Sequence, residues 1–395
     1  MEDETPYNVN ATITDVPANT TVPPFYLDGH RSENDFYAFH RPLFGYVDRY
    51  VTCIWYVIGL SGNTLAFLVW IRKRMRHSSG CYLSALALAD LIFLLLHICF
   101  ELEQTWNLKV ISVPIYCEIY PILSMTFQYT SPLFVLGFTV ERYISVCHPF
   151  KREQYCTIKK AVVVIVALMA TCLALSAVQG YFWQYNYVKK ECYPRAEVVA
   201  GGTYSPWSIW SWITEMTIFG FVPIMVLFFN ILVICEARKM RKLEITLGAK
   251  KSKKSASTTF MLLVVSFYLI ITTLPATIMY VLYFYFPYGD TNMNDEQIKL
   301  DETWQRHLDY KTIGQIVYEI CMSHYACNFF IYVATGKLFR RELKFIIYQY
   351  ICRKDWRQLR GKEFTESCGS PGTMKTTVDH NTRLLNGNNN AHTVL

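Results

Sequence analysis

Apolar residues dominate seven long stretches of the chain, and polar or charged segments separate them. The stretches lie near Val47–Trp70, Cys81–Glu101, Ile115–Val146, Ala161–Trp183, Trp207–Ile234, Thr259–Phe286 and Ile313–Ala334. Each is long enough to cross the roughly 30 Å hydrocarbon layer of a bilayer as a helix. The alternative, a large soluble helical protein, needs helices with polar outer faces. The segment AVVVIVALMATCLALSAV, residues 161–178, has no such face, so the pattern predicts seven transmembrane helices.

Composition and charge agree with a membrane protein and indicate its orientation. The 395 residues are 52% hydrophobic and only 17% charged, below the usual quarter. Lys and Arg are concentrated after the first, third, fifth and seventh stretches, as in IRKRMRH, residues 71–77. Because basic loops stay in the cytoplasm, we expect a cytoplasmic C-terminus and an extracellular N-terminus. The net charge of +7 then reflects loops beside acidic lipid, and nothing in the pattern indicates nucleic-acid binding.

Three segments of different composition follow from these boundaries. Residues 1–44 begin with the acidic MEDETPYNVN, lack the apolar core of a signal peptide, and are expected to be extracellular and disordered. They contain two glycosylation sequons, at Asn10 and Asn19. Residues 45–350 form the predicted membrane domain. Residues 351–395 are rich in Ser, Thr, Asn and Gly and are expected to form a disordered cytoplasmic tail.

Two of the thirteen cysteines lie clearly on the predicted extracellular side. Cys117 is at the outer end of the third stretch, and Cys192 is in the loop after the fourth. Two lone cysteines in an oxidising compartment predict one disulfide bond. Most of the others lie within the stretches or on the cytoplasmic side, where buried or reduced thiols are expected.

Polar residues of the third stretch share one face of the predicted helix. At 100° per residue, counted back from Arg142, four positions fall within about 40° of it. These positions are Cys117, Ser124, Gln128 and Ser131. Cys117 and Arg142 are separated by roughly 38 Å of helix, which reaches from one membrane surface to the other. A polar stripe on an apolar helix indicates that this face points into a helix bundle.

Glu141 and Arg142 therefore lie at the cytoplasmic mouth of the predicted bundle. The long guanidinium group can fold back onto the neighbouring carboxylate in one state and bind another partner in a second state. The pair is thus a candidate switch. The alternative is an interfacial Arg142 that extends to lipid headgroups, as is common near helix ends.

The motif Glu141-Arg142-Tyr143, followed by Pro149 and Phe150, resembles the cytoplasmic triplet of rhodopsin-like G-protein-coupled receptors. The resemblance covers about residues 45–350 and is specific because the matches occur in the family's order and spacing. Further matches are Gly62-Asn63, Leu86 to Asp90, Trp106, the Cys117 and Cys192 pair, Pro223, Pro275, and Asn328 to Tyr332. The fold class that it implies is an all-α membrane protein: a seven-transmembrane helix bundle with a short amphipathic cytoplasmic helix near Leu338–Tyr350.

The chain departs from this family at several switch positions. Phe329 replaces the usual Pro of the seventh helix, and Thr273 replaces the usual Trp of the sixth. The fourth stretch lacks its usual Trp, while Pro132 and Ile231 occupy positions that usually hold an aliphatic residue and a Tyr. The Asn-Phe-x-x-Tyr motif and Gly336 to Arg340 resemble invertebrate neuropeptide receptors of the FMRFamide, myosuppressin and CNMamide kind.

The resemblance implies two functional groups of residues inside the bundle. The G-protein switch would comprise Glu141, Arg142, Tyr143, Pro149, Phe150 and Tyr332. A polar core would comprise Asn63, Asp90, Ser131 and Asn328, and in the family such a core holds a sodium ion in the inactive state. Oxygen ligands suit this hard cation, and Asp90 would be its carboxylate ligand. A hydrogen-bonded core with trapped water is the alternative.

The predicted ligand pocket is aromatic and acidic. Ser124 stands where aminergic family members carry the Asp that pairs with an amine, so an amine ligand is not expected. The pocket candidates are His97, Glu101, Ser124, Gln128, Glu215, Tyr280 and Tyr283. An interfacial aromatic belt would explain the aromatic residues, but it does not explain Glu101 and Glu215 in apolar stretches. Glu319 lies off the face of Asn328 and is not assigned. Either carboxylate would pair with a basic group of the ligand or with an internal partner such as His97.

We therefore predict a plasma-membrane receptor, not an enzyme, that binds an extracellular neuropeptide and activates a cytoplasmic heterotrimeric G protein. A membrane transporter and a receptor for a non-peptide small molecule are the alternatives. No internal repeat supports a transporter, and Ile313–Ala334 contains no Lys that could bind retinal. In the tail, we expect arrestin to bind, Cys352 to be palmitoylated, and the C-terminal Thr-Val-Leu to fit a PDZ domain. The only cofactor expected is an allosteric sodium ion.

Overall fold

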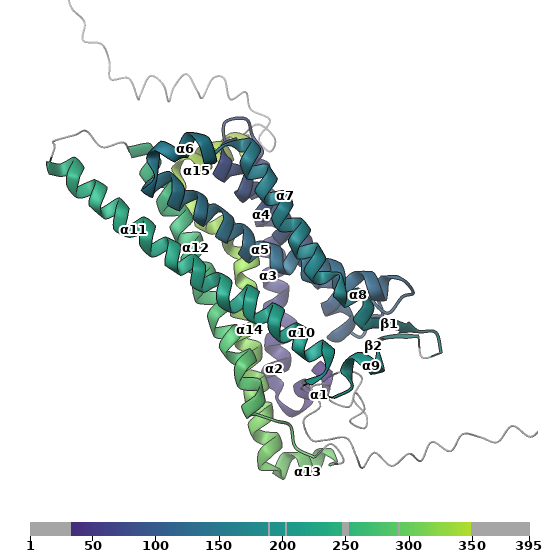
Figure 1. The fold of residues 1–395 in the computed structure, drawn as a ribbon. Coiled ribbons are helices and arrows are strands. Elements are labelled where there is room, and N and C mark those ends of the chain that lie inside the picture. Colours follow the sequence, from purple (N-terminus) through teal and green to yellow (C-terminus); the bar gives the residue numbers. More distant parts are fainter. Residues whose placement is uncertain (1–32, 189, 202–203, 247–252, 291–292, 349–395) are drawn as a thin grey trace, which may run out of the picture. The chain divides into compact units, whose positions relative to one another are not determined.

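The computed structural model describes residues 33–188, 190–201, 204–246, 253–290 and 293–348. The first half contains α1 (Glu33–His40), α2 (Pro42–Tyr46), the π-helix η1 (Val47–Val51), α3 (Thr52–Trp70), α4 (Ser78–Gln104), α5 (Tyr116–Cys147), α6 (Pro149–Tyr155), α7 (Ile158–Ser176) and α8 (Val178–Phe182). The second half contains β1 (Trp183–Asn186), β2 (Glu191–Pro194), α9 (Ala196–Val199), α10 (Pro206–Glu215), the π-helix η3 (Met216–Phe221), α11 (Val222–Thr246), α12 (Lys253–Leu282), the 3-10 helix η4 (Tyr283–Tyr285), α13 (Asp295–Leu300), α14 (Glu302–Thr335) and α15 (Lys337–Ile346) (Figure 1). The chain divides into two units, Met1–Leu343 and Lys344–Leu395, and the helix bundle belongs to the first.

Five helical stretches of the described chain are long and apolar enough to cross a membrane. They are Pro42–Trp70, Ser78–Gln104, Ile158–Phe182, Pro206–Leu243 and Thr259–Tyr285. The helices α5 and α14 are longer than most of these but contain more polar residues. Several of those polar residues, including Ser131 on α5 and Asn328 on α14, are buried against other helices. Their polarity is therefore compatible with a position inside a bundle.

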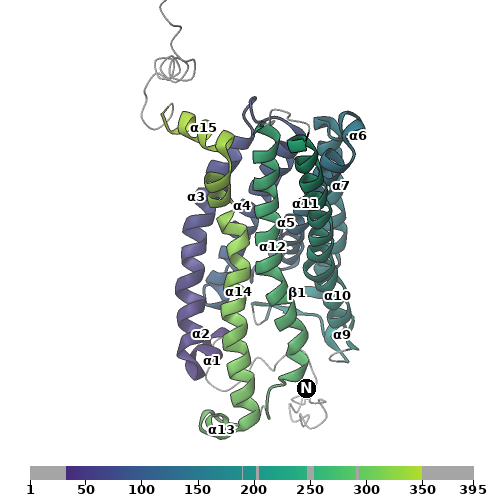
Figure 2. The same ribbon diagram turned by 90° about the vertical axis from the view of Figure 1, so that its left-hand side faces the viewer.

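The helices of this unit pack side by side, and α5 and α14 each contact several other helices. The helix α5 contacts α4, α7, α11 and α12, while α14 packs against α3, α4 and α12. Figure 2 shows α3, α14, α12 and α11 running alongside one another. Cys117 and Ser131 on the predicted stripe of α5 are fully buried. This face of α5 thus points toward other helices, as the periodicity predicts.

A close contact between α3 and α14 depends on two glycines. A Cβ atom on Gly59 would lie 3.1 Å from the Cβ atom of Ala326 and 2.4 Å from a methyl group of Leu94. A Cβ atom on Gly62 would lie 3.0 Å from the Cβ atom of Phe329. Phe329, the residue that replaces the usual proline, is therefore accommodated because the facing position has no side chain.

Local signals set where several helices begin and bend. Ser205 caps α10 by accepting a hydrogen bond from the backbone N–H of Ser208, and Pro206 occupies the first turn. Asp301 caps α14 in the same way, through the N–H of Trp304 at 2.7 Å. Pro275 lies inside α12, where it removes a helical hydrogen bond and favours a kink.

Two predictions about the fold are wrong in part. The fold is not entirely helical, because β1 and β2 form an antiparallel hairpin in which Cys192 pairs with Tyr185. Strand pairing satisfies the backbone of this loop, while the disulfide holds one strand against α5. Residues 33–44 are not disordered, since α1 and most of α2 lie there and bury Phe36, Tyr37 and Phe44.

Candidate functional site

A disulfide bond joins Cys117 at the start of α5 to Cys192 in β2, as predicted, with a Cα–Cα distance of 5.6 Å. We call the end of the bundle that holds this bond the disulfide end, and the end that holds Arg142 the arginine end. The bond fixes the hairpin to the helix that also carries Arg142. One helix therefore connects the two ends.

Glu103 organises the loop that precedes α5. Its Oε2 atom accepts hydrogen bonds from the backbone N–H groups of Val110, Ile111 and Ser112, at 2.6 to 3.0 Å. The hydroxyl of Ser112 donates to Oε1 of the same carboxylate and accepts from the N–H of Cys192 at 3.2 Å. Hydrogen bonds to a carboxylate are stronger than those between neutral groups, so Glu103 holds this loop in place. Glu103 was not predicted, because its partners are loop backbone groups with no sequence signature.

A cavity of about 210 Å³ lies between α4, α5, α10, η3, α12 and α14. Gln128, Glu215 and Tyr280, three of the predicted pocket residues, line it. Thr273, which replaces the usual tryptophan, also lines it and donates a hydrogen bond back to the carbonyl of Leu269 at 2.7 Å. The small threonine therefore leaves space where the family usually has an indole ring.

Glu215 presents its carboxylate to this cavity with little support from the protein. Tyr129 donates a hydrogen bond to Oε1 of Glu215 at 3.2 Å. No Lys or Arg within the described ranges forms an ion pair with this carboxylate. Tyr129 lies outside the predicted polar stripe of α5, so helical periodicity gave no reason to expect it in the site.

The other predicted pocket residues do not line this cavity. His97 lies between two tyrosines, with Nδ1 2.7 Å from the hydroxyl of Tyr56 and Nε2 2.7 Å from that of Tyr318. Glu101 and Ser124 are not among the cavity residues. Tyr283 instead packs against His307 and Tyr310 of α14. The structure thus divides the predicted pocket into separate groups and gives His97 partners other than Glu101.

Glu101 belongs to a buried acidic group with Asp48 and Glu319, both of which were unassigned. Gln315 donates to Asp48 at 3.0 Å and to Glu319 at 3.2 Å, and Thr52 donates to Glu319 at 2.6 Å. Within the described residues, no Lys or Arg pairs with these three carboxylates, and Oε1 of Glu101 and Oε2 of Glu319 lack a hydrogen-bond partner. No cluster of three or more His, Cys, Asp or Glu there is arranged to hold a metal ion.

The predicted polar core is buried, and the four helices α3, α4, α5 and α14 bring its residues together. Asn328 Nδ2 donates to Oδ2 of Asp90 at 2.9 Å, and Asn63 Nδ2 donates to the carbonyl of Tyr325 at 2.7 Å. Three oxygens have no hydrogen-bond partner in the described part of the chain: Oδ1 of Asp90, Oδ1 of Asn63 and the hydroxyl of Ser131. Unpaired buried oxygens of this kind suit a small hard cation or water.

At the arginine end, Glu141 and Arg142 form an ion pair of 3.0 Å. Two serines at the start of α4 support it: Ser78 and Ser79 donate to Oε1 of Glu141 at 2.9 and 2.6 Å, and Ser79 also contacts a guanidinium nitrogen of Arg142. The side chain of Arg142 is 13% exposed and that of Glu141 is 7% exposed. The serines had not been predicted as partners.

The remaining predicted switch residues lie around this pair. The hydroxyl of Tyr143 is 3.3 Å from Nε2 of His148, and Pro149 begins α6. Phe150 is 99% exposed. Tyr332 is fully buried and packs against Trp70 and Phe339. The predicted modification sites Asn10, Asn19 and Cys352, and the C-terminal PDZ motif, lie outside the described residues.

Comparison with known proteins places this geometry in a family. The model of the 7 transmembrane receptor (rhodopsin family) matches residues 62–332. The thyrotropin-releasing hormone receptor of Gallus gallus is 34% identical over 28% of this chain and 28% of its own. The growth hormone secretagogue receptor type 1 of Sus scrofa is 30% identical over 41% of this chain and 46% of its own. The neuromedin-U receptor 2 of Homo sapiens is 25% identical over 47% of this chain and 46% of its own.

These matched segments span less than half of each relative, whereas the family model covers more than half of this chain. The apolar helices show a multi-pass membrane protein. The chain belongs to the rhodopsin family of 7 transmembrane receptors.

Proposed function

We propose that this receptor binds a neuropeptide at its disulfide end and activates a heterotrimeric G protein at its arginine end. The main support is that α5 carries Gln128 in the cavity wall and Arg142 at the opposite end. A displacement of one helix could then reach both sites. The relatives reported above are receptors for thyrotropin-releasing hormone, for a growth hormone secretagogue and for neuromedin-U, which supports a peptide ligand.

The proposed topology has seven membrane spans, with the disulfide end outside the cell. The spans are the seven apolar stretches predicted from the sequence, which fall on the five apolar helical stretches and on α5 and α14. The first span then begins at Val47, and the seventh begins at Ile313 within α14. The basic loops support a plasma-membrane protein with an extracellular N-terminus. Phe339 and Leu343 of α15 are buried, whereas Lys337 and Arg341 are exposed. This division supports an amphipathic helix at the cytoplasmic membrane surface.

The cavity is smaller than the usual 300–1,000 Å³ of small-molecule pockets, so we propose that it admits one side chain of the peptide. A basic side chain would give the Glu215 carboxylate the cation that it lacks within the described chain. Arg suits the site best, because its planar guanidinium can pair with the carboxylate while stacking on Tyr280. The alternative anchor is Glu101, which does not line the cavity and so contributes less to ligand binding.

We propose that the Glu141–Arg142 ion pair is the inactive arrangement of the switch. In this state the two serines of α4 satisfy the pair. On activation, Arg142 would leave Glu141 and bind the G protein. Phe150 would dock into the same partner, since a fully exposed phenylalanine is a natural contact anchor. A Phe150 that inserts into lipid is the competing role.

The unpaired oxygens of Asn63, Asp90 and Ser131 support a sodium site completed by Asn328. A bound sodium ion would supply positive charge to the Asp90 carboxylate and so stabilise the inactive packing of α3, α4, α5 and α14. Trapped water would satisfy the same atoms. A sodium titration of agonist affinity distinguishes the two, because potassium at equal ionic strength should not reproduce a sodium effect.

Further proposed partners act at the tail, where arrestin would bind, Cys352 would carry a palmitoyl anchor, and a PDZ domain would capture the C-terminal carboxylate. Acidic lipid would contact the basic loops. Appending one alanine to the C-terminus should abolish PDZ binding in a pull-down. Unchanged capture would exclude that role.

A screen of amidated neuropeptides tests the function directly. Cells that express the chain with a promiscuous G protein should show peptide-stimulated nucleotide exchange. Cells that express Arg142→Ala should bind the same peptide without exchange. Solute flux in the absence of exchange would indicate a transporter, and exchange stimulated only by non-peptides would overturn the peptide ligand.

A further inference from the structure

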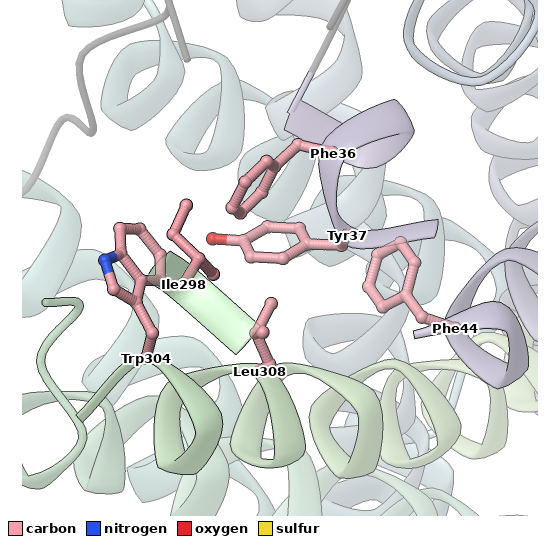
Figure 3. Packing of buried hydrophobic residues seen from close by; sticks show 6 residues of the cluster. All are labelled: Phe36, Tyr37, Phe44, Ile298, Trp304 and Leu308. Carbon is pink, nitrogen blue, oxygen red and sulfur yellow. The ribbon is translucent and has the colours of Figure 1, made fainter. Parts of the chain in front are cut away.

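The first described residues fold onto the disulfide end of the bundle. We call residues 33–46, which form α1 and α2, the N-terminal cap. Its buried side chains form one hydrophobic cluster with residues of α13 and α14 (Figure 3): Phe36, Tyr37, Phe44, Ile298, Trp304 and Leu308. Each is at most 5% exposed. The cap is therefore a packed part of the receptor.

Polar contacts attach the cap to α14. Arg41 pairs with Asp309 and donates to Oε1 of Gln305, both at 2.8 Å. Glu33 pairs with Lys311 at 3.2 Å. The ammonium group of Lys311 also lies 4.9 Å from the ring centre of Tyr37 and 5.5 Å from that of Tyr283. Charge and packing thus hold the same two elements together.

His307 of α14 joins three elements through one imidazole ring. Its Nδ1 atom lies 2.7 Å from the carbonyl oxygen of Phe286, just after η4, the 3-10 helix that follows α12. Its Nε2 atom lies 3.1 Å from the hydroxyl of Tyr37 in α1. A carbonyl only accepts, so Nδ1 carries the proton of the neutral ring, and Nε2 can accept from Tyr37, whose hydroxyl also forms a hydrogen bond with Glu33. This arrangement satisfies a neutral, fully buried histidine.

The same elements form part of the cavity wall. Tyr310 stacks on Phe286 with ring centres 5.0 Å apart and donates a hydrogen bond to the carbonyl of Met279 at 2.5 Å. Met279 directly precedes Tyr280, which lines the cavity, and α14 contributes Tyr318 to the same wall. The contacts around His307 therefore set the distance between two helices that enclose the cavity.

We propose that His307 is a positioning residue that holds the N-terminal cap against α12 and α14 at neutral pH and releases it in mildly acidic medium, which lowers ligand affinity. The affinity component rests on the proposed function. Release of the cap does not, because it depends only on contacts within the chain. An acidic intracellular compartment would then favour ligand release after internalisation.

The electrostatic surroundings of His307 support this behaviour. The residue precedes the predicted membrane span, and its burial lowers its pKa to about 4. The Phe286 carbonyl and the Glu33 carboxylate oppose this shift, while Lys311 adds to it. Tyr37, Tyr283, Tyr288, Trp304 and Tyr310 supply the surrounding rings. Burial is the largest of these effects, so the docked cap favours the neutral imidazole.

The direction of the pH effect follows from the difference between the pKa of His307 in the docked cap and in the released cap. An exposed histidine has a pKa near 6.5, so the released cap binds a proton in a range where the docked cap does not. Docking is then fully stable above about pH 6.5 and weakens as the pH falls toward 4. At pH 5.5 the release equilibrium should shift by about tenfold relative to pH 7.4.

Two other ionisable residues of the cap, Glu33 and His40, also contact its neighbours. The pKa of Glu33 is lowered, because Lys311 and Tyr37 together outweigh its burial. The stability that charged Glu33 contributes to cap docking is therefore lost only below the ordinary Glu pKa of about 4.5. His40 lies 3.1 Å from Asp295, so protonation of His40 would strengthen that contact. Neither residue accounts for release between pH 6.5 and 5.

Hydrogen exchange of the full receptor in lipid nanodiscs tests the proposal. Exchange of residues 33–46 is measured at pH 7.4 and 5.5 and corrected for the intrinsic pH dependence of the chemistry. Wild type should exchange about tenfold faster at pH 5.5. His307→Gln, which keeps a donor and an acceptor but does not titrate, should lose this difference. The matched variant His40→Gln should retain it.

Tyr37→Phe provides a second test if His307→Gln fails to reach the membrane. It removes only the hydroxyl, so the cap should be looser at both pH values while its acid sensitivity remains. Equal corrected exchange of wild type at both pH values would overturn the proposal. So would release only below pH 4.5, or loss of acid sensitivity in His40→Gln. If exchange changes as expected but ligand affinity does not, the cap is acid-labile and its link to the cavity is wrong.

Discussion

Glu141 and Glu215 are two carboxylates of one helix bundle with very different surroundings. Glu141, at the arginine end, pairs with Arg142 and accepts hydrogen bonds from Ser78 and Ser79. Glu215, in the cavity wall, receives one hydrogen bond from Tyr129, and no cation of the described chain pairs with it. Both sit among apolar residues, where an uncompensated charge is costly.

The difference indicates what each carboxylate is for. A carboxylate that is already paired within its own chain can stabilise the inactive state. The Glu141–Arg142 ion pair breaks only when another partner competes for Arg142. A carboxylate that is poorly satisfied and faces a cavity gains most when a cation arrives from outside. The number and kind of internal partners therefore separates a switch residue from a ligand anchor, although both are glutamates in helices.

The largest expected effect is at the Glu141–Arg142 ion pair. Arg142→Ala should abolish G-protein activation and leave agonist binding measurable, since the residue lies at the end opposite the cavity. Nucleotide exchange and radioligand binding measure the two properties separately. Arg152→Ala, on the neighbouring helix α6, is the matched control and should retain activation. Normal nucleotide exchange by Arg142→Ala would show that the Glu141–Arg142 pair is not a switch.

At the unsatisfied carboxylate, Glu215→Gln should lower agonist potency by roughly thirty- to several-thousand-fold, because a buried ion pair broken on one side costs about 2–5 kcal/mol. Glu101→Gln should have a smaller effect, since Glu101 does not line the cavity. Glu215→Arg should regain part of the loss with an agonist whose Arg is replaced by Glu. Potency unchanged by Glu215→Gln, with normal expression, would show that the cavity carboxylate is not the anchor.

A smaller effect is expected from loosening the switch without removing it. Ser79→Ala deletes a hydrogen bond to Glu141 and a contact to Arg142, so ligand-independent exchange should rise by about twofold to tenfold, equivalent to roughly 0.5–1.5 kcal/mol. Ser84→Ala is the control, because the hydroxyl of Ser84 donates to the carbonyl of Cys81 in its own helix. A fall in basal exchange would mean that the serines support the active arrangement.

The smallest expected effect is at the surface of the arginine end. Phe150→Ala should weaken coupling by about fivefold, near 1 kcal/mol, without loss of expression, because the ring is 99% exposed. The assay is the concentration of G protein needed for half-maximal exchange. Reduced membrane retention with unchanged coupling would instead assign the ring to lipid.

Sequence patterns predicted those features that depend on local geometry. The polar stripe on α5 follows from helical periodicity, so Ser131 could be placed on a buried face and Arg142 at one end. The disulfide followed from two cysteines in one compartment. The Glu141–Arg142 pair was accessible because its members are adjacent. The hairpin and the N-terminal cap were missed, since short strands and short docked helices carry weak local signals.

By itself, the sequence determined that this chain is helical and membrane-spanning, which residues face the bundle, and which charged pair lies at its arginine end. These properties repeat with the helix or arise between neighbours in the chain. Only the tertiary structure decided that Glu215, rather than Glu101, faces the cavity, that Glu103 organises a loop, and that His307 contacts Tyr37 from 270 residues away. Such contacts depend on how separate helices pack, and no single helix encodes the position of its partners.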